Sequence, residues 1–187
     1  MKRLTFVLLV LALTGCGKPT AEESFKKGDE AAQRAAAVMD TVKTDLEARL
    51  AFRPAVAAFE ELIANHPNDP LAEPALFRIA NIRNNFTREP QEAVDTYKRY
   101  IATYPNGQQT ELSMFLVGFL YNNQLHNLDS AAAAYTAFLA KYPESQYATS
   151  ARFELSTLGK PLEDLLPKSP IPEKPAAPKK HPKKTPV

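Results

Sequence analysis

Apolar residues recur at helical spacing in three successive stretches of the chain. Each stretch contains an alanine, an aromatic residue four positions later, and a proline twelve positions after the alanine: Ala55–Phe59–Pro67, Ala93–Tyr97–Pro105 and Ala131–Tyr135–Pro143. Corresponding residues stand 38 positions apart. Apolar residues at spacings of three and four predict one buried stripe per helix. Because a proline disfavours the α conformation of the preceding residue, each helix is predicted to end just before its proline.

A second helix is predicted after each proline, marked by a small residue thirteen positions later and a phenylalanine three residues before it. The small residues are Ala80, Gly118 and Ser156. An asparagine pair, Asn84-Asn85 or Asn122-Asn123, closes this helix in the first two copies. Asparagine tolerates the left-handed conformation, so the pairs are interpreted as helix C-caps, with contact to a ligand as the alternative.

The two ends of this pattern are irregular. Residues 21–52 read as one long alanine-rich helix, in which Met39 and Val42 stand 38 positions before Phe77 and Ala80. Pro54 is predicted to separate it from the following helix. Residues 151–160 supply a final helix without a partner. The acidic and lysine side chains of the long first helix are interpreted as a solvated cap.

These elements predict an all-α solenoid of helix-turn-helix units over residues 21–160, with about three repeats of 38 residues. The order of small residue, alanine, aromatic and proline resembles the tetratricopeptide repeat. It is carried by two sets: Ala80, Ala93, Tyr97, Pro105 and Gly118, Ala131, Tyr135, Pro143. The longer period and the Tyr-Pro ending are more similar to a bacterial periplasmic subclass, which includes BamD-type outer-membrane assembly lipoproteins and CpoB-type periplasmic proteins.

A solenoid of helix pairs presents a groove lined mainly by the first helix of each pair. Four residues beside the small positions are groove candidates: Asn81, Asn84, Phe119 and Asn122. In the alternative interpretation, Phe119 packs between repeats and the asparagines only cap helices. Groove asparagines suit hydrogen bonds to the backbone of an extended peptide, without strong sequence preference.

The chain begins MKRLTFVLLVLALTGC, a basic start followed by a short apolar stretch. Its LTGC ending resembles the lipobox of bacterial lipoproteins. The resemblance implies a signal peptide at residues 1–15, acylation of Cys16 with chains such as palmitate, and a linker at 16–20. Gly17 in place of an aspartate implies the periplasmic side of the outer membrane, or the outer face of the plasma membrane in a single-membrane bacterium. The alternative is an ordinary signal peptide with an incidental cysteine.

Charge divides the rest of the chain into two parts. Residues 16–166 hold 15 basic and 20 acidic side chains, a balance of −5 that argues against nucleic-acid binding. Residues 167–187 hold seven prolines and six lysines against one acid. The segment 161–187 is therefore predicted to be a disordered tail, because proline prevents it from joining a helical core. It is interpreted either as a solvated end or as a tether for cell wall or anionic lipid.

No sequence motif for catalysis, metal binding or a cofactor is recognisable. The segment GCGKPT lacks the spacing of a phosphate loop, and Cys16 is the only cysteine. The resemblances imply a membrane-anchored scaffold that binds other envelope proteins, in outer-membrane protein assembly as for BamD-type proteins. The alternative is a structural or division-linked CpoB-type role, in which the basic tail contacts the wall or an anionic surface. A periplasmic holdase is a third possibility.

Overall fold

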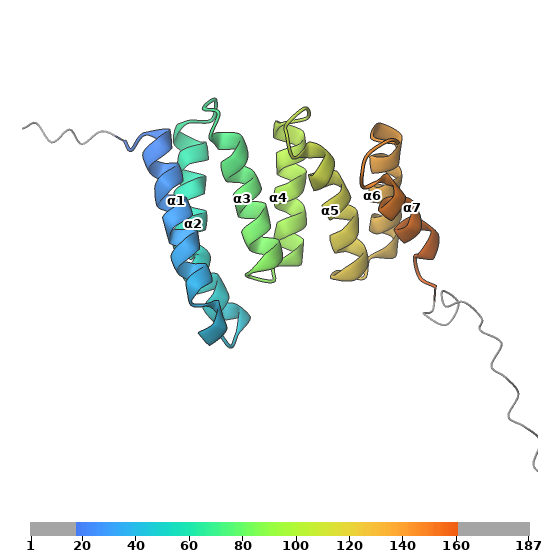
Figure 1. Cartoon of the computed structure of the whole chain (residues 1–187), viewed down its shortest axis with the longest axis horizontal. Helices are drawn as coiled ribbons and strands as arrows, with labels where there is room; N and C mark the ends of the chain where they lie inside the picture. The colour runs from blue at the N-terminus through green and yellow to red at the C-terminus, as the bar shows by residue number, and fades with distance from the viewer. Residues whose placement is uncertain (1–17, 161–187) are drawn as a thin grey trace, which may run out of the picture.

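The computed structural model describes residues 18–160, so Cys16, the signal segment and the basic tail lie outside the described part. The helices of this part form a row in which α1 and α7 stand at opposite ends (Figure 1). Their bounds are α1 Ala21–Ala37, η1 Met39–Thr41, α2 Asp45–Asn65, α3 Ala72–Asn85, α4 Pro90–Thr103, α5 Thr110–Asn123, α6 Leu128–Lys141 and α7 Ala148–Thr157. Three antiparallel pairs, α1–α2, α3–α4 and α5–α6, and the single helix α7 confirm the all-α repeat solenoid.

The prolines mark the helix ends as predicted. Helices α2, α4 and α6 each stop two residues before Pro67, Pro105 or Pro143. The residue between the helix and the proline has φ between −125° and −135° in all three cases, outside the helical region. Pro90 occupies the first turn of α4, where its missing N–H leaves no helical hydrogen bond unmade.

The small residue of each first helix packs under the aromatic ring of the second helix. Gly118 on α5 lies so close to Tyr135 on α6 that a Cβ at this position would be 2.7 Å from the ring. In the preceding pair, Ala80 and Tyr97 belong to the same core cluster, and both are fully buried. The small residue thus sets how closely the two helices approach.

The first pair corrects the prediction of a helix break at Pro54. The chain leaves the helical conformation between α1 and α2, and Pro54 lies inside α2. Helix α2 begins with a capping box, in which the Thr44 hydroxyl accepts from Glu47 N–H and the Glu47 carboxylate accepts from Thr44 N–H. An interior proline costs about 3 kcal/mol. Burial of Phe52 and Phe59 on the same helix offsets that cost.

The first helix also has a different register from the predicted one. Gly28, not Val42, holds the small position, because a Cβ there would lie 2.5 Å from the Phe59 ring. Phe25 stands three residues before Gly28, as Phe77 stands before Ala80. More chain separates Gly28 from Phe59 than separates Gly118 from Tyr135, so the first unit is longer than the third.

The asparagine pairs do not form left-handed caps. Asn85 and Asn123 are the last residues of α3 and α5, and the positive φ values, both 51°, fall at Arg88 and His126. The Glu89 N–H, just beyond the first of these turns, donates to the Arg83 carbonyl at 3.0 Å. The left-handed residue therefore lies in the loop, three residues after each pair.

Buried tyrosines make a prediction about alkaline stability. Burial raises the pKa of Tyr97 to about 12 and also raises the pKa values of Tyr100 and Tyr135. Below pH 10 both folded and unfolded chains keep these protons, so stability is unaffected. Between pH 10 and 12 only the unfolded chain loses the Tyr97 proton, which lowers the free energy of unfolding by about 1.4 kcal/mol per pH unit.

Urea titrations at several pH values, followed by circular dichroism, measure this slope. Tyr97→Phe is expected to make the slope between pH 10 and 12 shallower, whatever its effect at neutral pH. An unchanged slope in the variant would contradict the assignment to Tyr97.

Candidate functional site

The first helices of the units, α1, α3, α5 and α7, form one face, here named the odd-numbered face. Polar contacts join neighbouring helices across it. Asp29 on α1 pairs with Arg78 on α3 at 3.6 Å, and the Asn122 amide on α5 donates to Glu154 on α7 at 2.8 Å. Gln124, directly after α5, donates to Asn84 on α3 at 3.3 Å. These contacts link each first helix to the next one along the solenoid.

A hollow of about 230 Å³ opens between α1 and α3 on this face. Aromatic and aliphatic side chains of α2 and α3 form its floor, among them Phe52, Phe59 and Ile82. The polar lining residues are Asp29, Gln33, Arg78 and Asn81. An apolar hollow with a few placed polar groups has the composition of a binding site for one apolar side chain.

Asn81 is held in place from the core. The buried Tyr97 hydroxyl donates to Asn81 Oδ1 at 2.8 Å, so the amide oxygen is fixed toward α4. Within residues 18–160, no acceptor pairs with the Nδ2 group of Asn81. This group is therefore a positioned hydrogen-bond donor at the edge of the hollow.

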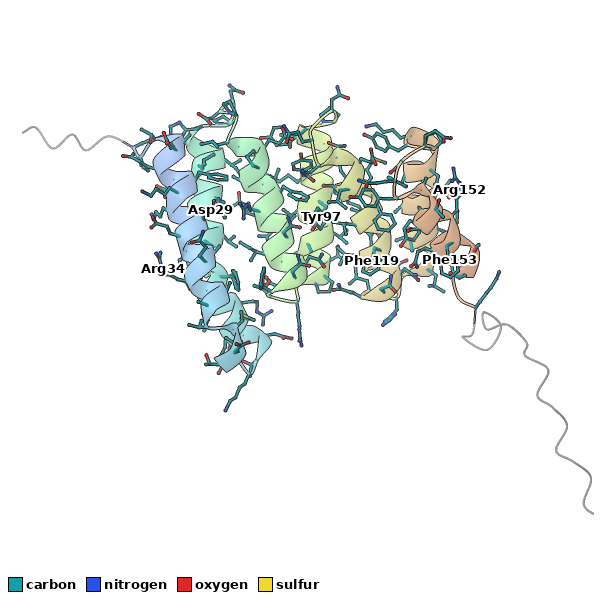
Figure 2. All side chains as sticks on the ribbon, viewed as in Figure 1. Asp29, Arg34, Tyr97, Phe119, Arg152 and Phe153 are labelled. Carbon is teal, nitrogen blue, oxygen red and sulfur yellow. The ribbon has the colours of Figure 1, made fainter. Side chains whose placement is uncertain are left out.

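Asp29 supplies the complementary acceptor. Its Oδ1 atom is buried and has no hydrogen bond among the described residues, with the Arg78 guanidinium 3.6 Å away. The Asp29 side chain as a whole is 27% exposed, so the accessible part of its carboxylate offers an acceptor to a donor from outside. Figure 2 shows Asp29 on α1 and Tyr97 on α4, on either side of α3.

The predicted groove residues do not all meet at one place. Asn81 lines the hollow between α1 and α3, whereas Phe119 occupies the same repeat position one unit later, on α5. Phe119 is half-buried, and its ring centroid lies 6.5 Å from that of Phe115. Asn84 and Asn122 lie one turn further along and bond to side chains of the next unit.

The sequence interpretation missed Asp29, Gln33 and Arg78. It took the acidic and lysine side chains of the first helix, Asp29 among them, for a solvated cap, and it did not single out Gln33 or Arg78. A signal was present in the Phe25–Gly28 spacing, which repeats that of Phe77–Ala80 and sets the register of α1. With that register, Asp29 stands at the position of Asn81.

Among residues 18–160, no cluster of three or more His, Cys, Asp or Glu side chains is arranged to hold a metal ion. No helix of the described part is both long and apolar enough to span a bilayer.

The geometry defines a class of protein: a solenoid of antiparallel helix pairs with a polar face built from the first helices. Two segments of this solenoid, residues 74–107 and 112–145, match the tetratricopeptide repeat family. They cover α3–α4 and α5–α6 with their loops, and their starts are separated by one repeat period. The described part of the chain is thus a tetratricopeptide-like solenoid, an architecture that supports a protein–protein interaction scaffold, and proteins of the matched family are typically non-catalytic. A comparison with curated proteins gives no match.

Proposed function

We propose that the protein is a lipid-anchored scaffold of the bacterial cell envelope that binds extended segments of other envelope proteins on its odd-numbered face. The observation that carries the binding site is the arrangement around the hollow between α1 and α3. There a fixed donor, Asn81 Nδ2, and a partly exposed acceptor, the Asp29 carboxylate, flank an apolar floor. The lipobox-like LTGC sequence supports the anchor at Cys16.

The chemistry of the site suits an extended peptide. A backbone carbonyl of the peptide accepts from Asn81 Nδ2, a backbone N–H donates to the exposed part of the Asp29 carboxylate, and one apolar side chain enters the hollow of about 230 Å³. Arg78 remains half-exposed beside Asp29 and attracts acidic residues of the bound segment. No covalent bond is made or broken on binding.

The envelope process is assigned by resemblance. Similarity to BamD-type proteins favours outer-membrane protein assembly, although about three repeats make this chain shorter than the usual five-repeat form. The binding site itself needs only an extended segment with an apolar side chain, as β-barrel precursors and their assembly proteins supply.

The first test is affinity purification of the full chain from detergent-solubilised membranes, with identification of what co-purifies. Asn81→Ala and Arg78→Ala are each expected to lower recovery of a specific envelope protein at least severalfold, because the first removes the hydrogen-bond donor and the second removes the positive charge that attracts acidic residues of the bound segment. Asn85→Ala is the matched control, since Asn85 is exposed at the end of the same helix.

Asn81→Ala leaves the Tyr97 hydroxyl without its acceptor, so melting temperatures must accompany the binding data. Arg78→Ala leaves that bond intact and separates binding from stability. Equal recovery with all three variants and the unchanged chain would rule out the odd-numbered face as the binding site.

The alternative envelope role, as a CpoB-type structural protein, is favoured by the six lysines of residues 167–187. Here the tail contacts wall polymer or anionic lipid, and the repeats space or oligomerise the molecule. Deleting residues 167–187 distinguishes the two roles. Loss of envelope function with intact repeats and unchanged co-purification would favour the tail over the odd-numbered face.

The anchor makes a separate prediction. Cys16→Ser is expected to abolish incorporation of an alkyne-tagged fatty acid and to move the protein from the membrane to the soluble fraction. Stable anchoring needs two or more acyl chains, at about 0.8 kcal/mol for each buried methylene group. Continued sedimentation with membranes, without the label, would show that another segment holds the protein there.

A further inference from the structure

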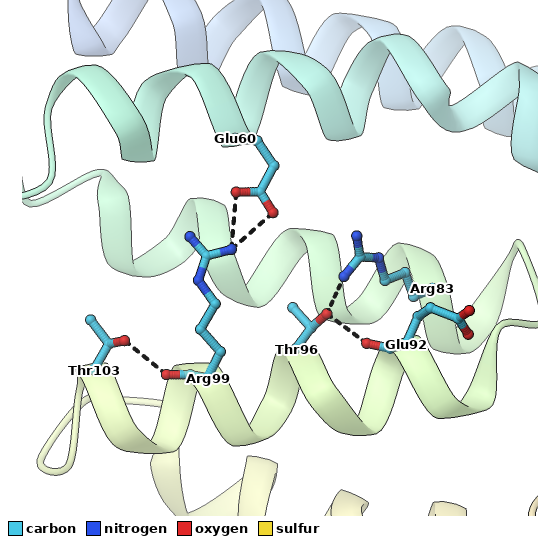
Figure 3. Close-up of polar contacts among 6 residues, drawn as sticks. All are labelled: Glu60, Arg83, Glu92, Thr96, Arg99 and Thr103. Atoms are coloured by element: carbon cyan, nitrogen blue, oxygen red, sulfur yellow. Dashed lines mark hydrogen bonds and ion pairs between the residues drawn. The ribbon is translucent and has the colours of Figure 1, made fainter.

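The exposed sides of α2, α4 and α6 form the opposite, even-numbered face, where two gaps between helices are filled differently. In the first gap, between α2 and α4, two separate groups of polar side chains make hydrogen bonds and an ion pair (Figure 3). Arg99 Nη1 donates to both Glu60 carboxylate oxygens, at 2.9 and 3.0 Å. Arg83 donates to Thr96 Oγ1, and the Thr96 hydroxyl donates to the Glu92 carbonyl at 2.6 Å.

The second gap, between α4 and α6, carries the residues found 38 positions later. Glu60 corresponds to Lys98, Arg83 to Tyr121, Thr96 to Ala134 and Arg99 to Ala137. On α6, alanines therefore stand at the positions where α4 has the longer, polar side chains of Thr96 and Arg99. Across the gap, Lys98 donates to the Tyr121 hydroxyl at 2.8 Å and lies 5.0 Å from the centre of its ring.

The result is an apolar hollow of about 310 Å³ that opens to solvent. Ile101, Met114 and Val117 line it from α4 and α5, and the alanines of α6 form its shallow wall. At its rim, Lys98 has no carboxylate within 4 Å among residues 18–160. In the first gap, by contrast, the charge of Glu60 is balanced by Arg99 from the facing helix.

We propose that this hollow is a second protein-binding site, which takes a large apolar side chain of a protein partner together with a carboxylate beside it. The apolar side chain fills the space left by Ala134 and Ala137, and the carboxylate pairs with Lys98. In the second gap, the partner thus supplies to α4 the side-chain volume and the opposite charge that α4 supplies to α2 in the first gap. A shallow open hollow suits a single anchoring side chain of a protein surface better than a whole small molecule, which needs enclosure.

The site lies on the face opposite the peptide site of α1 and α3, so the two are independent. A scaffold with binding sites on both faces holds two proteins at once, and either site is removable without the other.

The test uses four labelled peptides that differ only in one apolar residue, Phe or Ala, and one neighbouring residue, Glu or Gln. Fluorescence anisotropy with the full chain measures their affinities. The Phe–Glu peptide is expected to bind most tightly. Ala134→Leu fills the hollow and is expected to weaken that peptide about tenfold or more, because the buried side chain no longer fits. Thr136→Leu, exposed on the same helix, is the matched control and should leave binding unchanged.

The charge is tested separately by Lys98→Gln, a change of an exposed side chain that leaves the core intact. This variant is expected to weaken the Phe–Glu peptide about threefold, as for a partly exposed ion pair, and the Phe–Gln peptide little. The double-mutant cycle between Lys98 and the peptide carboxylate therefore shows coupling.

Several outcomes would overturn the proposal. Equal binding of the Phe and Ala peptides, equal effects of Ala134→Leu and Thr136→Leu, or an absence of coupling to Lys98 each does so. So does a hollow filled by a second copy or by the segment 161–166 of the same chain. If a second copy fills the hollow, Ala134→Leu would change the sedimentation coefficient. If the segment 161–166 fills it, peptides would bind only after Leu165 and Leu166 are substituted. Binding lost through Asn81→Ala and Arg78→Ala instead would place the peptides on the odd-numbered face.

Discussion

Replacing Phe59 with alanine is expected to lower the free energy of unfolding by about 3–5 kcal/mol, the range for a fully buried phenylalanine. Phe59 has no exposed surface, lies directly over Gly28, and meets the Phe25 ring edge-to-face at 5.5 Å. Its removal leaves a cavity between α1 and α2, which the surrounding side chains fill only in part. Loss of this ring therefore loosens the first helix pair, including the wall of the hollow that carries Asp29.

Urea unfolding of the full chain, followed by circular dichroism in the far ultraviolet, measures the effect. Phe153→Ala is the matched control, since Phe153 on α7 is 60% exposed and its loss should change stability by less than about 0.5 kcal/mol. Figure 2 shows Phe153 at the far end of the row from Asp29. Similar losses for both variants would contradict the packing of Phe59 at the centre of the first pair.

Replacing Gly118 with leucine is expected to destabilise the fold by about 2–3 kcal/mol through overpacking. A Cβ at this position would lie 2.7 Å from Cδ1 and 2.8 Å from Cε1 of Tyr135, which is itself fully buried. Helices α5 and α6 must then separate, and the Tyr135 ring loses its contact with Phe115, whose centroid is 5.9 Å away. The higher helix propensity of leucine, worth about 0.8 kcal/mol, only partly offsets this cost.

The same substitution in α7 provides the control. Ser156 stands at the position of Gly118 one repeat later and is exposed, because no described helix packs on that side of α7. Ser156→Leu is therefore expected to leave the urea midpoint nearly unchanged or slightly raised. A large loss for Ser156→Leu, or a tolerated Gly118→Leu, would show that close helix approach is not what this repeat position requires.

The structural features that the sequence predicted correctly have local physical causes. Proline excludes the helical conformation of its neighbour whatever the rest of the chain does, so the ends of α2, α4 and α6 were predictable. The repeat period likewise placed Gly118 and Tyr135 at the same two positions as Ala80 and Tyr97 in the unit before.

Local reasoning failed in the first unit for a physical reason. Pro54 is a helix breaker by propensity, but burial of Phe52 and Phe59 outweighs its cost, and this burial depends on α1 and α3 being in place. The Phe25–Gly28 spacing offered the register of α1, but the 38-residue period pointed to Val42 instead, and the contact between Gly28 and Phe59 decides between them. The asparagine pairs failed similarly, since Asn122 bonds to Glu154 on another helix and does not cap its own.

The candidate sites likewise depend partly on local sequence and partly on tertiary contacts. The sequence by itself determined that the chain is a row of helix pairs and pointed to Asn81 as a surface polar residue beside a small position. Only the tertiary structure placed Asp29 next to Arg78 and Asn81, because α1 and α3 are separated in sequence by the whole of α2 and meet through the packing of the folded chain. The second hollow could not be predicted from the sequence either. Its alanines are ordinary helix formers, and only the folded chain places Lys98 of α4 opposite them. The repeat pattern determines how the two helices of each pair pack together, and contacts between pairs decide which side chains lie together on the surface.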